Sequence, residues 1–200
     1  MLTAPRVVGR RGLICALGLA FVPSPRAAAS SYRIDERFGS IAFAVSVLGL
    51  FSVSGRFLRF SGDLRLDPRR PEATAIDVVV PTAEVDLPLA EQRELIRSPA
   101  YFDSAAHPTA RFVSQAVSVA APDRFLIDGL LTLRGVTNPV RLEARLTERR
   151  RDPERGIDTA DVVAWATVSR SAFGMVADRL LLSDRVRLDI RLRLEVPDGG

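Results

Sequence analysis

The sequence has 200 residues, with 28 basic and 24 acidic side chains, one histidine and one cysteine. All the basic residues are arginines, and four of them fall in the first 29 residues, which leaves 24 arginines and 24 acidic residues in the rest. This balance removes the usual basis for predicting nucleic-acid binding from a basic chain. Because Cys15 also lies in the first 29 residues, the remainder can form no disulfide, thiolate nucleophile or cysteine metal site.

The first 29 residues have the layout of a secretory signal peptide. A basic opening precedes an apolar run over Leu13–Val22, two prolines follow, and Ala27–Ala29 supplies the small residues that a signal peptidase needs. The run is far shorter than the ~20 residues needed to span a bilayer, so we expect no permanent membrane anchor. The pair Arg10–Arg11 fits twin-arginine export about as well as the general secretory route. We predict a periplasmic or secreted protein, with residues 30–200 forming one domain.

The remaining sequence alternates apolar and polar residues in short segments, the pattern of half-buried β-strands. The last segment is the clearest, because six apolar residues from Val186 to Val196 alternate with six arginine or acidic residues. In chain order, the predicted strands are Tyr32–Asp35, Ser40–Val47, Leu58–Asp67, Ile76–Val80, Thr109–Val119, Arg124–Arg134, Pro139–Glu148, Asp161–Ser169 and Arg185–Val196.

Three connections between these strands are also predicted. Leu48–Phe51 reads as a turn, Gly135–Pro139 as a turn in which Gly135 allows a positive φ, and Asp152–Thr159 as a polar turn. Pro88–Ser98 is the one predicted helix, with proline in its first turn. The helix would either cover a sheet edge or act as a lid, and we favour the cover.

About eight strands with short connections predict an all-β, eight-stranded antiparallel barrel, because closure removes the exposed edges of the sheet. Such a barrel is wide enough to be filled by side chains or to hold one small ligand. Several residues predicted to face inward are small, namely Gly62, Gly129, Ala144, Ala164 and Ala166. They favour a long apolar cavity, although small residues also relieve crowding at barrel corners.

The sequence offers little for catalysis. His107 is the only histidine, it lies in a loop, and no nucleophile elbow accompanies it. No phosphate-binding loop or cluster of metal ligands is apparent. We therefore predict that the protein is not an enzyme and has no metal or cofactor.

Four segments resemble the YceI-like, polyisoprenoid-binding family of secreted bacterial proteins. The segments are Gly49–Phe57 (GLFSVSGRF), Arg97–Ser114 (RS, FD, P and F-x-S), Gly129–Val140 (GLLTLRGVTNPV) and Arg170–Val186 (R, FGM and SD-x-V). The resemblance extends from Tyr32 to Val196 in the right order. It implies a lipocalin-like barrel whose interior holds a long isoprenoid chain, an isoprenoid quinone or a similar amphiphile.

Two positions depart from the family pattern. Val47 and Leu95 stand where the family often has histidine. If those histidines contact a polar head group in relatives, the ligand of this protein has a different head group or none.

Face parity and the resemblance give a set of residues expected to bind the ligand. This set is Phe43, Val45, Phe60, Leu64, Phe112, Phe125, Ile127, Leu131, Leu142, Phe173, Met175, Ile190 and Leu192. Phe173 and Met175 would either plug one end or pack as ordinary core. Arg97 and Arg170 are candidates for contact with an anionic head group, with a structural ion pair as the alternative role.

The alternative function is an interaction module that docks a membrane or redox partner and needs no ligand. Homodimerisation through an exposed strand or the helix is compatible with the sequence but has no specific support in it.

Overall fold

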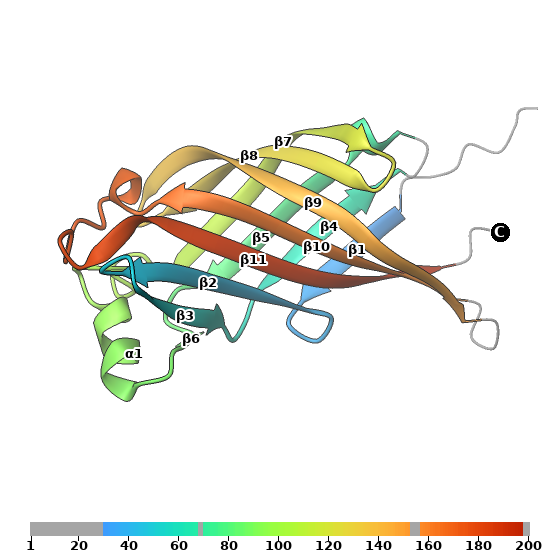
Figure 1. Cartoon of the computed structure of the whole chain (residues 1–200). Coiled ribbons are helices and arrows are strands. Elements are labelled where there is room, and N and C mark those ends of the chain that lie inside the picture. The colour runs from blue at the N-terminus through green and yellow to red at the C-terminus, as the bar shows by residue number, and fades with distance from the viewer. Residues whose placement is uncertain (1–29, 68–69, 153–156, 198–200) are drawn as a thin grey trace, which may run out of the picture.

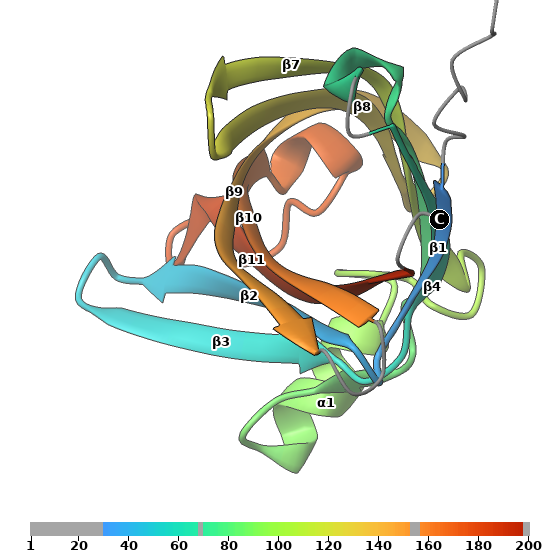
Figure 2. The same cartoon turned by 90° about the vertical axis from the view of Figure 1, so that its right-hand side faces the viewer.

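The computed structural model describes residues 30–67, 70–152 and 157–197, so the predicted signal peptide lies outside the described residues. These residues form one antiparallel sheet that curls around a central space (Figures 1 and 2). The strands are β1 (Ser30–Asp35), β2 (Gly39–Val47), β3 (Phe51–Phe57), β4 (Ser61–Leu66), β5 (Ala75–Pro81), β6 (Val85–Asp86), β7 (Thr109–Ala121), β8 (Arg124–Leu133), β9 (Val136–Asp152), β10 (Ile157–Ser169) and β11 (Leu182–Pro197). The helices are α1 (Ala90–Arg97) and two 3-10 turns, η1 (Pro71–Ala73) and η2 (Ser171–Phe173).

Within residues 30–67, 70–152 and 157–197, the all-β antiparallel class and the single α-helix are confirmed, but the strand count is eleven rather than eight. The sequence reading missed β3 and β6. It placed a turn at Leu48–Phe51 and started the next strand at Leu58, whereas the turn ends before Phe51 and β3 pairs with β2 from Phe51 to Phe57. Only two residue pairs join β6 to β3, too few to leave an alternating pattern in the sequence.

The strand order is β1-β4-β5-β7-β8-β9-β10-β11-β2-β3-β6. Among the described residues, no hydrogen-bonded ladder joins β1 to β6, the first and last strands of this order. The barrel wall is instead completed where β1 lies beside β11. Beyond β11, the β2–β3 hairpin continues the sheet toward β6 and α1 (Figure 2). The helix therefore lies at one end of the barrel, which we call the α1 end. The opposite end carries the β7–β8 connection, and we call it the hairpin end (Figure 1).

The long strands form because their alternation suits a wall with one apolar and one solvated face. In β10, Ala164, Ala166 and Val168 are buried, and each stands opposite an apolar residue of β11. The β8–β9 turn is tighter than predicted: Arg134 and Gly135 both have positive φ (53° and 72°), as a two-residue hairpin requires, and β9 already begins at Val136.

Candidate functional site

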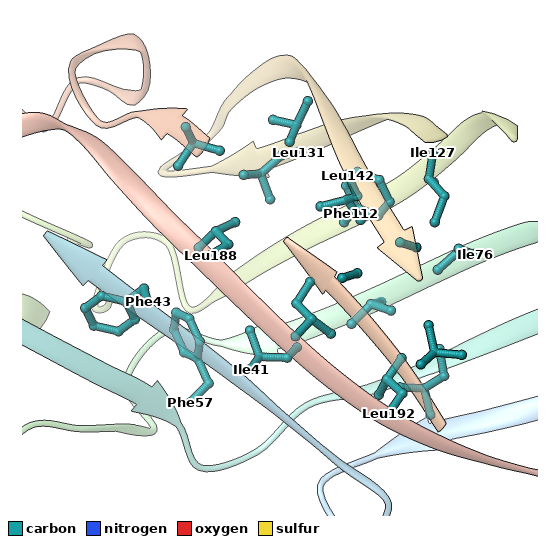
Figure 3. A pocket seen from close by; sticks show the side chains of 18 of the residues that line it. Ile41, Phe43, Phe57, Ile76, Phe112, Ile127, Leu131, Leu142, Leu188 and Leu192 are labelled. Carbon is teal, nitrogen blue, oxygen red and sulfur yellow. The ribbon is translucent and has the colours of Figure 1, made fainter. Parts of the chain in front are cut away.

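The inside of the barrel is an apolar cavity of about 1040 Å³. Its lining comes from β1–β5, β7–β11, α1 and connections at both ends of the barrel. Figure 3 shows side chains such as Ile41, Ile76, Phe112, Leu142 and Leu188 converging from separate strands on one interior. The buried clusters of the protein are the walls of this space. The sheet therefore does not fill its own interior.

Eleven of the thirteen residues expected to bind a ligand line the cavity. They are Phe43, Val45, Leu64, Phe112, Phe125, Ile127, Leu131, Leu142, Met175, Ile190 and Leu192. Their contact with a ligand stays a prediction.

Phe60 and Phe173 do not line the cavity, so the structure does not support their placement there. Both are almost completely buried, with 2% and 1% of their surface exposed, inside the largest core cluster. Phe60 lies in the irregular segment between β3 and β4, where strand parity does not hold, and Phe173 lies in η2. Of Phe173 and Met175, the two residues proposed to plug one end of the barrel, only Met175 lines the cavity.

Sequence reasoning missed several lining residues because β-bulges change the face that a strand presents. The register of β7 shifts between Ser114 and Ala116, so Val117 and Val119 line the cavity although the parity of Phe112 would point them outward. Phe57 was missed because β3 was missed, and it packs with Phe43 at a ring-centroid distance of 5.5 Å.

The small inward-facing residues have two different roles. Ala144 and Ala164 line the cavity and widen it, as predicted. Gly129 does not line it: a Cβ there would collide with the Phe112 ring and would lie 2.6 Å from the Val113 carbonyl oxygen. Gly129 therefore makes room for an aromatic ring on the neighbouring strand rather than for a ligand.

At the α1 end, hydrogen bonds link Tyr101 to Asp178 and Arg134, whereas the Gln92 side-chain oxygen has no partner. The Tyr101 hydroxyl donates a hydrogen bond to the Asp178 carboxylate, and the Arg134 guanidinium donates to the Tyr101 carbonyl oxygen at 2.6 Å. Burial, aided by the hydrogen bond to Asp178, raises the pKa of Tyr101 to about 12. Tyr101 therefore stays a neutral donor at any physiological pH.

Arg170 lines the same end and is 4% exposed. Its guanidinium donates to the carbonyl oxygens of Ser183 (3.1 Å), Met175 (3.0 Å), Ala177 (2.6 Å) and Leu182 (3.2 Å). Four of its five N–H donors are thus used by the backbone, which leaves too few for an anionic head group.

Arg97, the other head-group candidate, is not part of the cavity wall. It donates to the Ala83 carbonyl oxygen at 2.8 Å and pairs with Glu94 at 3.0 Å. Neither arginine singled out from the sequence is therefore placed to hold a head group.

The hairpin end presents other arginines because of a second bulge. Glu148 pairs with Asp161 and Leu146 with Val162, so Thr147 is the extra residue on β9. After the bulge, Arg149 stands opposite Ala160, which faces the cavity, whereas unbroken alternation from Leu146 would turn Arg149 outward. Arg149 is exposed at the rim and has no ion pair with another described residue.

The outer face of the barrel carries cross-strand ion pairs, as the alternating charges predicted. Arg111 pairs with Asp77, Arg141 with Asp128 and Arg193 with Asp161, and in each case the guanidinium lowers the pKa of the carboxyl group. Because these pairs are solvated, their net effect on stability is small.

The described residues show no cluster of metal-ligating side chains. No group of three or more histidine, cysteine or acidic side chains is placed to hold a metal ion within 30–67, 70–152 and 157–197. His107 packs near Gly135 of the β8–β9 turn, and its carbonyl oxygen accepts a hydrogen bond from Thr82 at 2.8 Å. In the same part of the chain, no helix has the length and apolar character needed to cross a membrane.

Comparison with known families identifies the sequence pattern. Residues 32–194 match the model of the YceI-like domain. A UPF0312 protein of Azotobacter vinelandii is 38% identical over 143 residues, which cover 70% of this chain and 74% of that protein. A UPF0312 protein of Shewanella sp. strain MR-7 is 34% identical over 184 residues, or 90% of this chain and 96% of that protein.

Solved structures share the fold. BcnA of Burkholderia cenocepacia matches with a TM-score of 0.68 at 21% identity, covering 78% of this chain and 95% of BcnA. A polyisoprenoid-binding domain from Saccharophagus degradans, implicated in plant cell wall breakdown, matches with a TM-score of 0.59 at 15% identity, covering 84% of this chain and 99% of that domain.

Proposed function

The chain belongs to the YceI-like family, and from this premise we propose that it is a non-catalytic binding protein that carries or sequesters a long isoprenoid-like amphiphile inside its barrel. The observation that carries the proposal is the apolar interior of about 1040 Å³, which the side chains of the surrounding sheet do not fill. The structural likeness to a polyisoprenoid-binding domain of Saccharophagus degradans supports the same ligand class. An isoprenoid alcohol, an isoprenoid quinone and a related lipid all fit this description.

The cavity wall explains how such a ligand would bind without a charged contact. Each methylene group removed from water contributes roughly 0.8 kcal/mol, so a chain of several isoprene units gains affinity from burial alone. The predicted signal peptide at residues 1–29 supports a function outside the cytoplasm, in the periplasm or after secretion.

The first test is to purify the protein from the periplasm and to examine it by native mass spectrometry, with organic extraction of any bound lipid. We expect one lipid per protein, or stoichiometric loading when polyprenols or quinones are added. An empty protein that takes up none of these lipids would contradict the proposal.

A pair of tryptophan variants tests whether the lipid lies in the barrel. Leu131 faces the cavity and Leu130, its neighbour on β8, does not. Leu131→Trp should narrow the channel near the β8–β9 turn and exclude about four methylene groups of the ligand, a loss of roughly 3 kcal/mol or about 200-fold in affinity. Leu130→Trp, the matched control, should bind normally. Equal lipid uptake by both variants would remove Leu131 from the binding site.

A second candidate function, docking on a membrane surface, is favoured by exposed apolar side chains at the α1 end. Leu50, Phe51 and Leu180 are 80%, 69% and 94% exposed, and the Leu48 amide donates to the Leu181 carbonyl oxygen at 2.7 Å, which joins the two loops that carry them. Leu181 also lines the cavity, so this patch is continuous with the apolar interior. Such patches mark interaction sites.

Flotation with phospholipid vesicles tests this second candidate. The unaltered protein should float with the vesicles, and the double variant Leu50→Ser/Leu180→Ser should remain in the dense fraction. A protein that never floats would exclude membrane docking, while leaving the lipid-binding proposal intact.

A further inference from the structure

Tyr32 presents a buried polar atom to the cavity that the protein does not satisfy. Its side chain is 7% exposed and lines the apolar interior. Its hydroxyl has no hydrogen-bond partner. Buried tyrosine hydroxyls usually find a partner, so an unpaired one needs an explanation.

The neighbours of Tyr32 cannot provide that partner. On the adjacent strand β4 it stands opposite Leu64, which in turn stands opposite Ile76 of β5. Across the closure it packs in the same cluster as Leu192 and Leu194 of β11. All these side chains are hydrocarbon, and no protein atom accepts a hydrogen bond from the buried hydroxyl.

The register locates this hydroxyl near the hairpin end. Tyr32 is two residues from the start of β1, which at about 3.3 Å per residue places it roughly 7 Å inside the barrel. Thr74, at the same end, also lines the cavity with an unpartnered, buried hydroxyl oxygen. Two unsatisfied hydroxyl groups therefore lie just inside one mouth of an apolar channel.

At the α1 end the situation differs. Tyr101 donates to Asp178, and the Arg170 guanidinium is used by the backbone. Gln92 also lines this end, and its side-chain oxygen has no partner. Tyr32 differs from Gln92 and from the rim residue Arg149 because its hydroxyl is buried among hydrocarbon side chains inside the hairpin end.

We propose that Tyr32 donates a hydrogen bond to an uncharged acceptor oxygen, of the ketone or quinone carbonyl type, at the polar end of the bound chain. The inference rests on the proposed lipid-binding function and specifies the ligand class further. The oxygen belongs to an uncharged group because the side chains next to Tyr32 are hydrocarbon. An ionised phosphate or carboxylate would instead lie at the rim, where Arg149 is exposed. The hydrocarbon tail then extends toward the α1 end.

The test compares two isoprenoid probes on the wild type and on Tyr32→Phe, which removes only the hydroxyl. Geranylgeranylacetone carries a terminal ketone, and squalene carries no oxygen. Both are measured by displacement of the neutral dye diphenylhexatriene from the cavity. We expect Tyr32→Phe to lower the affinity for the ketone about tenfold and to leave squalene unchanged within about twofold.

Infrared difference spectra provide a second measurement that does not depend on affinity. The carbonyl band of bound geranylgeranylacetone should shift to lower frequency in the wild type and return to its unbonded position in Tyr32→Phe. Thermal unfolding should show that the variant is at least as stable as the wild type, since an unpaired hydroxyl is removed.

The outcomes separate this inference from the proposed function. If the wild type binds both probes but Tyr32→Phe changes neither, or weakens both equally, Tyr32 does not contact the ligand oxygen and the inference is overturned. If the wild type binds neither probe, the proposed function fails first and the inference fails with it.

Discussion

Replacing Arg170 tests whether this buried cation holds the α1 end together or serves a ligand. Arg170→Met keeps most of the aliphatic stem but removes four hydrogen bonds from a charged donor to the carbonyl oxygens of Met175, Ala177, Leu182 and Ser183. Each such bond contributes roughly 1.5–3 kcal/mol. Some of these carbonyls regain water in the variant, so we expect a total loss of about 3–5 kcal/mol in the free energy of unfolding. Arg170→Lys should recover only part of this, because an ammonium group cannot reproduce the planar fork of donors.

Urea denaturation measures the loss, and hydrogen exchange should show faster exchange in residues 175–183. Arg97→Met is the control, because Arg97 is partly exposed and its pair with Glu94 is solvated, so it should cost less than about 1 kcal/mol. An Arg170→Met variant with wild-type stability but weakened binding of an anionic lipid would refute the structural role and restore the head-group role.

Two further predictions concern Tyr101 and Gly129. Because the pKa of Tyr101 is about 12 in the fold against about 10 in an unfolded chain, the folded state holds this proton more tightly, so its stabilising effect is complete below pH ~10 and is lost as the pH rises toward ~12. Urea melts at rising pH should show this loss in the wild type and not in Tyr101→Phe. In Tyr32→Phe, Tyr101 is the only tyrosine left, so the tyrosinate absorbance of this variant should have its midpoint near pH 12. A midpoint near pH 10 would contradict the burial argument. Gly129→Ala should lower the free energy of unfolding by about 1–3 kcal/mol through its collision with the Phe112 ring, and a double-mutant cycle with Phe112→Leu should recover part of the loss; independent, additive effects would show that the ring is not responsible.

The long strands were predictable because their physics is local. In β11, every second residue from Val186 to Leu194 must meet the apolar interior, and the arginine and acidic residues between them must meet water. Ten of the residues predicted from this alternation lie on the cavity wall. The elements that were missed, β3 and β6, depend on pairing with distant segments: β6 contributes only Val85 and Asp86, held by β3.

Polar positions were harder to predict because they depend on three-dimensional register. In the sequence, nothing distinguishes Arg170 from the other arginines. Only the structure shows that residues 175–183 fold back around it and that their carbonyl oxygens accept its hydrogen bonds. Arg149 reads as part of a solvated run of arginines, and only the bulge at Thr147 turns it to the rim of the cavity. A bulge adds one residue without a distinctive sequence mark, so strand parity is reliable up to it and reversed after it.

The asymmetry of the two ends gives the cavity a direction. At the α1 end, Tyr101 and Arg170 already have partners, so a ligand group placed against either of them would have to displace an existing hydrogen bond. At the hairpin end, Tyr32 and Thr74 have hydroxyl oxygens without partners, and a ligand oxygen placed there would gain a bond and break none. An apolar wall alone would accept a chain in either orientation, because burial of hydrocarbon has no directional preference. If Tyr32 binds the ligand oxygen as we propose, this hydroxyl, rather than the shape of the cavity, sets the orientation, with the head at the hairpin end and the tail toward α1.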